Sequence, residues 1–438
     1  ADYTIIDDGE SHIDPDLPEE DLERLKVIED IESDKVVCAY LQEDDTVEAA
    51  YERFEAYDCV SNVSANICFY EDGSITTSDG TISTDDPRFN DNRQWQFQRI
   101  NLPKAWNRFD TVSGRRRVVV AVIDCGVQIG HPDLDDVILM DKSVDITQRC
   151  EDPDRSHGNY LLLSECADSV GRTGQYTSSH GTMVAGVIAA EANNGRLSAG
   201  AASLGGKTGF ENRIKIMALK CDDSVDSGRH ITASYLYQAI NYAVDQGAHV
   251  INISYSAPRS TYGGDYEHLQ EAVDRAVAAR VCIVGSAGND NSDAVRYPAG
   301  LAGVIGVGAI NSDVVDNKYY LTDYSNYSSA VDIVAPSGQK NKRLVFSTCP
   351  TTINSGGYAY SKGTSYAAPQ VAATVAMMMK IKPGLTPNQY LSRIQNRSTV
   401  TADKIDEDSD DEYEDDAVLG TFKLLNAGRA VYLMEEPE

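Results

Sequence analysis

The chain has 438 residues, of which 38 are Lys or Arg and 68 are Asp or Glu, and its net charge at pH 7 is −30. This excess of negative charge repels phosphate backbones and anionic membrane surfaces, which argues against nucleic acid as a partner. No apolar run reaches the roughly 18 residues of a membrane span, and Ala1 precedes acidic rather than basic and apolar sequence. We therefore expect a soluble protein with one large domain and a smaller one.

Two changes of composition divide the N-terminal part of the chain. Residues 1–34 are dominated by Asp and Glu with few large apolar side chains, which predicts a disordered or loosely held leader. Two apolar runs, 35–41 and 60–70, enclose a helix-like segment at 46–56, and this pattern predicts a small α+β unit. Residues 72–86 are rich in Gly, Ser, Thr and Asp, which is typical of an exposed linker.

From residue 84 to residue 438, short apolar runs alternate with helical segments. Runs this apolar suit strands that are buried on both faces, and they lie at 117–123, 214–219, 248–253, 281–284, 304–307 and 331–334. Helices predicted at 233–246 and 268–279 would connect such strands by crossovers, which implies a parallel sheet. The predicted fold is an α/β domain over 84–438, a doubly wound and mostly parallel sheet flanked by helices, preceded by the small α+β unit of 35–83.

Three polar residues stand at the ends of apolar runs or the starts of helical segments. Asp124 ends VVVAVID, His180 opens HGTMVAG, and Ser365 lies in GTSYAAP. A serine hydroxyl needs an imidazole to take its proton, and a buried carboxylate fixes the tautomer of that imidazole and stabilises its cation. Each residue alone has an ordinary interpretation as a turn residue, a packed histidine or a helix cap.

The flanking segments favour catalysis over these ordinary interpretations. IDCGVQIGHPDL, SSHGTMVAGVIAA and GTSYAAPQVAA resemble the three signature segments of the subtilisin family of serine endopeptidases. The order Asp, His, Ser is that of subtilisin itself, so the order belongs to the resemblance and is not a separate prediction. The resemblance covers roughly residues 84–430, and it implies a subtilisin-like fold with Asp124, His180 and Ser365 as the catalytic triad.

Acyl transfer also needs hydrogen-bond donors for the oxygen that becomes negative in the tetrahedral intermediate, a contribution of about 3 to 4 kcal/mol per donor. By the resemblance, Asn289 in GSAGN supplies a side-chain donor. The backbone N–H of Ser365, at a helix N-terminus, would supply a second. Without the resemblance, Asn289 and the following Asp would be interpreted as a turn.

Substrate contacts are implied along two further segments. A peptide would lie extended beside Ser254, Tyr255 and Ser256 and pair with their backbone as an added strand. By the resemblance, the first specificity pocket is lined or closed by Ala287, Gly288 and Arg296. A guanidinium there would favour Glu or Asp on the acyl side of the scissile bond, whereas a different loop length would turn Arg296 to the surface.

A structural Ca²⁺ is the cofactor that the resemblance implies. Hard cations bind several carboxylate, amide and carbonyl oxygens. The segments that resemble the tight calcium site of the family contain Asp86, Asp133, Glu191 and Asn194. Each of them also has an ordinary interpretation, because Asp133 can cap a turn and Asn194 can end a helix.

The resemblance implies a secreted, monomeric endopeptidase that acts on peptides or proteins. The unit of 35–83 stands where the family carries a propeptide that inhibits its own enzyme, so we expect a zymogen that is processed within 72–94. An acid-preferring pocket would cut after Asp85 or Asp86, which conflicts with Asp86 as a calcium ligand.

Two other classes of function remain as alternatives. A catalytically silent member of the fold would be a binding protein, and an intact set of catalytic residues argues against this. A nucleotide-binding oxidoreductase would need a GxGxxG or GxxxxGK[ST] motif after a strand, and the chain has neither. The nine cysteines show no metal-ligand spacing; Cys150 and Cys166 form either one disulfide or two free thiols.

Overall fold

The computed structural model describes six strands before residue 77 and then residues 86–111, 117–149, 160–163, 179–203, 214–222, 231–262, 266–315, 318–405 and 418–434. The chain divides into two compact units, Ala1–Ser83 and Thr84–Glu438, and each is described by itself. Within the described residues, no helix combines the length and the apolar character that crossing a lipid bilayer requires.

The first unit contains an antiparallel sheet in the order β2-β3-β1-β4 and a small hairpin. Its strands are β1 (Asp2–Asp7), β2 (Leu25–Ile31), β3 (Asp34–Tyr40), β4 (Val60–Ala65), β5 (Cys68–Phe69) and β6 (Ile75–Thr76). The expectation of a leader without regular structure is wrong for β1 and β2. Their Tyr, Thr, Ile, Leu and Val residues suit strands, and β1 pairs with both β3 and β4 despite the surrounding acidic sequence. The helix expected at 46–56 lies outside the described residues.

The second unit is built on a sheet of eleven strands, in the order β19-β18-β14-β13-β12-β11-β7-β10-β8-β9, with β15 beside β13. Its strands are β7 (Val118–Asp124), β8 (Val144–Arg149), β9 (Tyr160–Leu162), β10 (Ile214–Lys220), β11 (Val250–Ile253), β12 (Cys282–Ser286), β13 (Val304–Val315), β14 (Lys318–Leu321), β15 (Ile333–Pro336), β18 (Thr401–Ile405) and β19 (Val418–Lys423). The central strands pair in parallel. At one end of the sheet, β14 runs antiparallel to β13, and β19 runs antiparallel to β18. The predicted mostly parallel α/β sheet is thereby confirmed.

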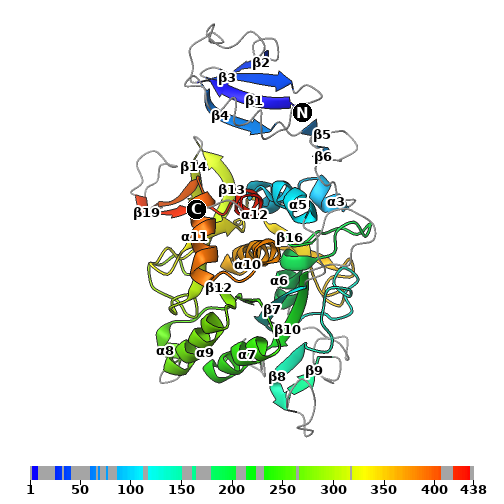
Figure 1. The fold of residues 1–438 in the computed structure, drawn as a ribbon, viewed down its shortest axis with the longest axis vertical. Coiled ribbons are helices and arrows are strands. Elements are labelled where there is room, and N and C mark those ends of the chain that lie inside the picture. Colours follow the sequence, from blue (N-terminus) through cyan, green and yellow to red (C-terminus); the bar gives the residue numbers. More distant parts are fainter. Residues whose placement is uncertain are drawn as a thin grey trace. The chain divides into compact units, whose positions relative to one another are not determined.

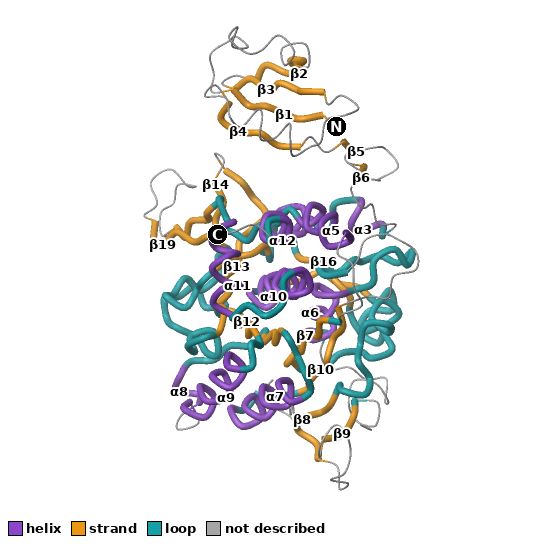
Figure 2. The backbone as a smooth tube through the Cα atoms, in the orientation of Figure 1, coloured by secondary structure: helices purple, strands orange, loops and turns teal. Residues whose placement is uncertain are grey.

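Helices cover both faces of this sheet, as Figures 1 and 2 show. The helices are α3 (Pro87–Asn90), α4 (Trp95–Arg99), α5 (Leu102–Thr111), α6 (His180–Ala189), α7 (Ala233–Asp245), α8 (Arg259–Tyr262), α9 (Tyr266–Ala278), α10 (Thr364–Ile381), α11 (Pro387–Arg397) and α12 (Ala427–Tyr432). On one face, α7 and α9 pack through apolar residues at helical spacing, such as Leu236, Ala239, Ile240 and Ala243. On the other face, α6 lies beside α10, which is buried along nearly its whole length.

The strand order reverses around β7. From β7 the chain first builds β8, β9 and β10 on one side of it, and then β11, β12 and β13 on the other side. In doubly wound sheets such a switch point leaves a crevice outside the carboxyl ends of the strands, where ligands bind. Asp124 is the last residue of β7 and therefore stands at this crevice.

Candidate active site

Asp124 is held rigidly at the end of a strand whose seven residues are all buried. The residue is 4% exposed, its Oδ1 accepts a hydrogen bond of 2.8 Å from the Cys125 N–H, and its carbonyl oxygen accepts one of 2.9 Å from the Cys221 N–H. Both backbone and carboxylate are thus fixed, which is what an orienting carboxylate requires.

His180 is the first residue of α6, and its imidazole lies against the Asp124 carboxylate. The distances from Nδ1 to Oδ1 and Oδ2 are 2.9 and 3.0 Å. The next residue, Gly181, allows this close approach, because a Cβ there would collide with the carbonyl oxygen of Gly126. A carboxylate acceptor at Nδ1 selects the tautomer that carries its proton on Nδ1, which makes Nε2 the nitrogen that can act as a base.

Ser365 lies in the first turn of α10, after Gly363, whose φ of 129° requires glycine. Four residues further on, Pro369 has no N–H to donate to the Ser365 carbonyl oxygen. The hydroxyl of Ser254, which follows β11, donates to that oxygen instead over 2.7 Å. This contact joins the serine turn to the neighbouring strand end.

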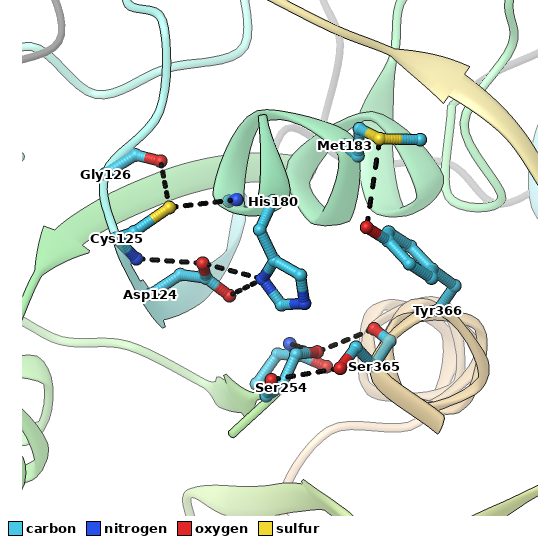
Figure 3. A network of polar contacts seen from close by, with 10 residues as sticks. Asp124, Cys125, Gly126, His180, Met183, Ser254, Ser365 and Tyr366 are labelled. Atoms are coloured by element: carbon cyan, nitrogen blue, oxygen red, sulfur yellow. Dashed lines mark hydrogen bonds and ion pairs between the residues drawn. The ribbon is translucent and has the colours of Figure 1, made fainter. Parts of the chain in front are cut away.

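Figure 3 shows the His180 ring between Asp124 and Ser365. The Ser365 hydroxyl donates to the carbonyl oxygen of Ser254 over 3.2 Å, so its proton points to the strand end. Rotation about the Cα–Cβ bond would redirect it, and catalytic hydrogen bonds commonly tighten only when substrate is bound. The centre of the Tyr366 ring lies 5.5 Å from the centre of the His180 ring.

Asn289, shortly after β12, is oriented by the same turn. Its Oδ1 accepts hydrogen bonds from the N–H of Thr364 over 2.8 Å and from the Thr364 hydroxyl over 3.0 Å. With the oxygen held in this way, Nδ2 is the end of the amide that is left to donate. Asn289 and Ser365 line the same pocket of about 220 Å³.

Comparison with known proteins identifies this constellation. Residues 115–419 match the subtilase family, Peptidase_S8. The chain belongs to the subtilase family. The thermophilic serine proteinase of Bacillus sp. (strain AK1) is 32% identical over 314 residues, 71% of this chain and 62% of that protein, so the match spans less than two thirds of it.

Two further relatives agree with this assignment. Thermitase from Thermoactinomyces vulgaris is 31% identical over 320 residues, which are 73% of this chain and 91% of thermitase. A solved protease from Pseudoalteromonas arctica PAMC 21717 superposes with a TM-score of 0.59 at 27% identity, over 80% of this chain and 99% of that one. The family and the fold that the signature segments suggested are confirmed.

The pocket of this subtilase includes more residues than the sequence indicated. It is lined by the expected catalytic residues Asp124, His180, Asn289 and Ser365. The expected segment Ser254–Ser256 also lines it. Four lining residues were missed, namely Cys125, Asp222, Ile231 and Ser286. Three of them, Cys125, Asp222 and Ser286, stand within two residues of the end of a central strand, and this is the one sequence signal that could have indicated them.

The structure does not place the expected specificity residues in the lining of this pocket. Ala287, Gly288 and Arg296 are not among its lining residues. A Cβ at Gly288 would come within 2.9 Å of Arg296 Cγ, so the arginine stem packs against this glycine. The Arg296 guanidinium forms an ion pair of 2.9 Å with Asp290, and its side chain is 21% exposed.

Two of the expected calcium carboxylates, Asp86 and Asp133, contact the loop after α6, which carries the other two expected residues, Glu191 and Asn194. Asp86 and Asp133 are completely buried; Asp86 accepts from the N–H of Asn193 over 2.9 Å and Asp133 from Nδ2 of Asn194 over 2.7 Å. Burial is the main cause that raises the pKa of Asp133 to about 7. The Glu191 carboxylate accepts instead from the Asp136 N–H over 3.0 Å.

Proposed function

We propose that this chain is a secreted endopeptidase that hydrolyses peptide bonds through an acyl-enzyme. The observation that carries the proposal is the convergence of Asp124, His180, Ser365 and Asn289 at one pocket from four separate segments of the chain. In this mechanism Ser365 Oγ attacks the carbonyl carbon as His180 Nε2 takes the proton, and the imidazolium then protonates the leaving amine. Water hydrolyses the acyl-enzyme by the same route.

The experiment that tests this function uses the purified chain and a library of peptides. Incubation with Ca²⁺ is expected to yield internal cleavages in the library, which mass spectrometry of the products would locate. Release of single terminal residues only, or no cleavage by a chain whose N-terminus has been shortened, would contradict it.

We further propose that the unit Ala1–Ser83 is an intramolecular inhibitor and that the mature enzyme is a monomer. Support comes from its place in the sequence before the peptidase unit and from the division of the chain into two compact units after Ser83. Asp86 is buried at the start of α3, so processing before Asp86 would leave it in place as one of the calcium ligands proposed below. The new N-terminus from the same incubation is therefore expected before Asp86.

Asn289→Asp is expected to lower kcat by about 10³ with little change in KM, in line with the loss when subtilisin loses this donor. Aspartate keeps the oxygen that accepts from the Thr364 N–H but removes the donor and brings a negative charge to the oxyanion. Steady-state kinetics on one peptide would measure both constants. The matched change Asn291→Asp, on an exposed residue nearby, should leave kcat unaltered. Equal kinetics of the two variants would remove Asn289 from the oxyanion site.

We propose that Arg296, whose stem packs against Gly288, gives a preference for Glu or Asp on the acyl side of the scissile bond. Because Asp290 already pairs with Arg296, an acidic substrate must compete with this ion pair and the preference should be modest. Arg296→Gly is expected to lower the ratio of cleavage after Glu to cleavage after Leu by about fivefold, roughly 1 kcal/mol. Arg280→Gly, at an exposed residue with φ of 60°, is the control. An unchanged ratio in Arg296→Gly would remove the preference.

We propose that Ca²⁺ binds where Asp86 and Asp133 meet the loop that carries Asn194, with Glu191 as an outer member of the site. The residues fit a hard cation, because two carboxylates are buried there with amide and carbonyl oxygens. Within the described residues no cluster of three or more His, Cys, Asp or Glu could hold a metal, so amide and carbonyl oxygens must complete the ligand set.

Removal of Ca²⁺ is expected to lower Tm by roughly 5 to 10 °C, since a ligand at a thousandfold excess over its Kd stabilises by about 4 kcal/mol. The effect should be larger at pH 8 than at pH 5.5. The raised pKa of Asp133 means that the folded state holds a proton that the unfolded state releases, so without Ca²⁺ stability falls as pH rises from about 4 to about 7. Calorimetry with Ca²⁺ and with EDTA at both pH values would test this. Identical Tm values under all four conditions would exclude the site.

A further inference from the structure

A second cleft lies on the peptidase unit, and it shares no lining residue with the active-site pocket. We call it the basic cleft. It is formed by α4, the outer part of β13 and the loop 341–343, and its volume of about 670 Å³ falls within the roughly 300 to 1,000 Å³ of typical ligand sites. None of the residues assigned to catalysis, specificity or calcium lines it.

The charge of the basic cleft is opposite to that of the chain. Its lining has three cationic side chains, those of Arg99, Lys342 and Arg343, and one carboxylate, that of Asp313. The whole chain, in contrast, carries a net charge of −30. Lys342 forms an ion pair of 2.9 Å with Asp313. Within the described part of the chain, no carboxylate forms an ion pair with Arg99 or Arg343, although Asp313 interacts electrostatically with Arg99 at longer range; three positive charges and one negative charge leave the lining with a net charge of +2.

The Arg99 guanidinium is fixed in place by neutral groups. Its Nη2 donates to the carbonyl oxygen of Ser312 over 3.0 Å, its Nη1 donates to the Tyr319 hydroxyl over 3.3 Å, and it lies 4.9 Å from the centre of the Tyr319 ring. Arg343 is exposed at the rim. Oriented arginines of this kind bind carboxylates and phosphates with geometric specificity.

Two buried amide atoms at the basic cleft indicate which of these two anions the ligand carries. Oδ1 of Asn92 and Nε2 of Gln98 find no hydrogen-bond partner among the residues that the structure describes. Buried polar atoms without a partner are costly, which indicates that a ligand supplies one donor and one acceptor. A peptide backbone offers both, whereas a phosphate diester offers acceptors only and would leave Asn92 Oδ1 unsatisfied.

We propose that the basic cleft is a second binding site, which takes an acidic polypeptide segment through its carboxylates and its backbone amides. Arg99 and Arg343 bind the acidic side chains, and Asn92 and Gln98 pair with backbone N–H and C=O groups. The segment lies outside the active-site pocket, so its binding does not require cleavage.

The test uses the full chain with Ser365→Ala, so that the ligand is not hydrolysed and the result does not depend on the proposed function. Fluorescence anisotropy would measure the binding of a labelled octapeptide of alternating Glu and Gly. Arg343→Glu is expected to weaken binding at least tenfold, and Gln98→Leu about fivefold at an unchanged Tm. Lys340→Glu, an exposed control with the same charge change outside the lining, should change Kd less than twofold.

Competition separates the possible ligands. A Lys-Gly octapeptide should not displace the probe, and dimethyl phosphate, a diester, should displace it only at a concentration at least a hundredfold above that of unlabelled Glu-Gly peptide. Equal Kd values for Arg343→Glu and Lys340→Glu would overturn the site. Displacement by dimethyl phosphate and by Glu-Gly peptide at equal concentrations would overturn the assignment to a polypeptide.

Discussion

Ser365→Ala is expected to lower kcat/KM for peptide hydrolysis by about a million-fold, the size of the loss known for the triad of subtilisin itself. Without the hydroxyl there is no nucleophile to form the acyl-enzyme, and only the oxyanion donors and substrate binding still act. Progress curves with a fluorogenic peptide would measure the rate, and circular dichroism would establish that the variant is folded.

The control for this variant is a serine away from the pocket. Ser361→Ala, in the hairpin strand β17 (Tyr358–Ser361), should keep kcat/KM within twofold of the parent value. Ser365 is 8% exposed, and alanine removes only its hydroxyl, so a folding defect is not expected. If Ser365→Ala retained a hundredth or more of the parent activity, another residue would be the nucleophile.

Asp124→Asn is expected to lower kcat by about 10⁴ while KM changes little, as in serine proteases whose triad aspartate is replaced by asparagine. The amide has nearly the shape of the carboxylate, but its NH₂ group cannot accept from His180 Nδ1–H. The imidazole then takes the wrong tautomer, and Nε2 no longer serves as the base. Steady-state kinetics of the two proteins would measure the effect.

The control for Asp124→Asn makes the same chemical change on the surface. Asp274 is an exposed residue of α9, so Asp274→Asn should leave kcat unaltered. A loss of less than tenfold in Asp124→Asn would show that the close contact between Asp124 and His180 does not contribute to the chemistry.

The buried centre of the fold could be predicted from the sequence because its strands are apolar on both faces. The run at 117–123 corresponds to β7 and the run at 214–219 to β10, each within one residue at either end. The end of the sheet was missed because its residues are polar. In β18, Asp403 and Lys404 interrupt the apolar pattern, and β13 extends beyond the predicted 307 to Val315 through Asn311, Ser312 and Asp313.

The triad could be recognised because each of its members lies within a signature segment. The other lining residues could not, because what brings them to the pocket is the register of neighbouring strands. Asp222 reaches it because Lys220 at the end of β10 pairs with Asp124 at the end of β7. The basic cleft is a stronger case, since Arg99 and Arg343 are 244 positions apart and no local sequence pattern places them in one cleft.

The acidic N-terminal sequence shows where composition alone fails to predict structure. Composition argued against structure in residues 1–34, yet Ile5 is paired with Val37 on one side and Val63 on the other. Strand pairing over such sequence separations depends on partners that a local pattern does not contain.

The central claim is that Ser365 is a nucleophile activated by His180 and Asp124. Labelling with a fluorophosphonate, followed by mass spectrometry of the labelled peptide, tests it most directly, because the probe reacts with activated serines. We predict one adduct, on Ser365, which forms much more slowly in Asp124→Asn and not at all in Ser365→Ala. An adduct on another residue, or peptide hydrolysis by a protein in which Ser365 remains unlabelled, would contradict the claim.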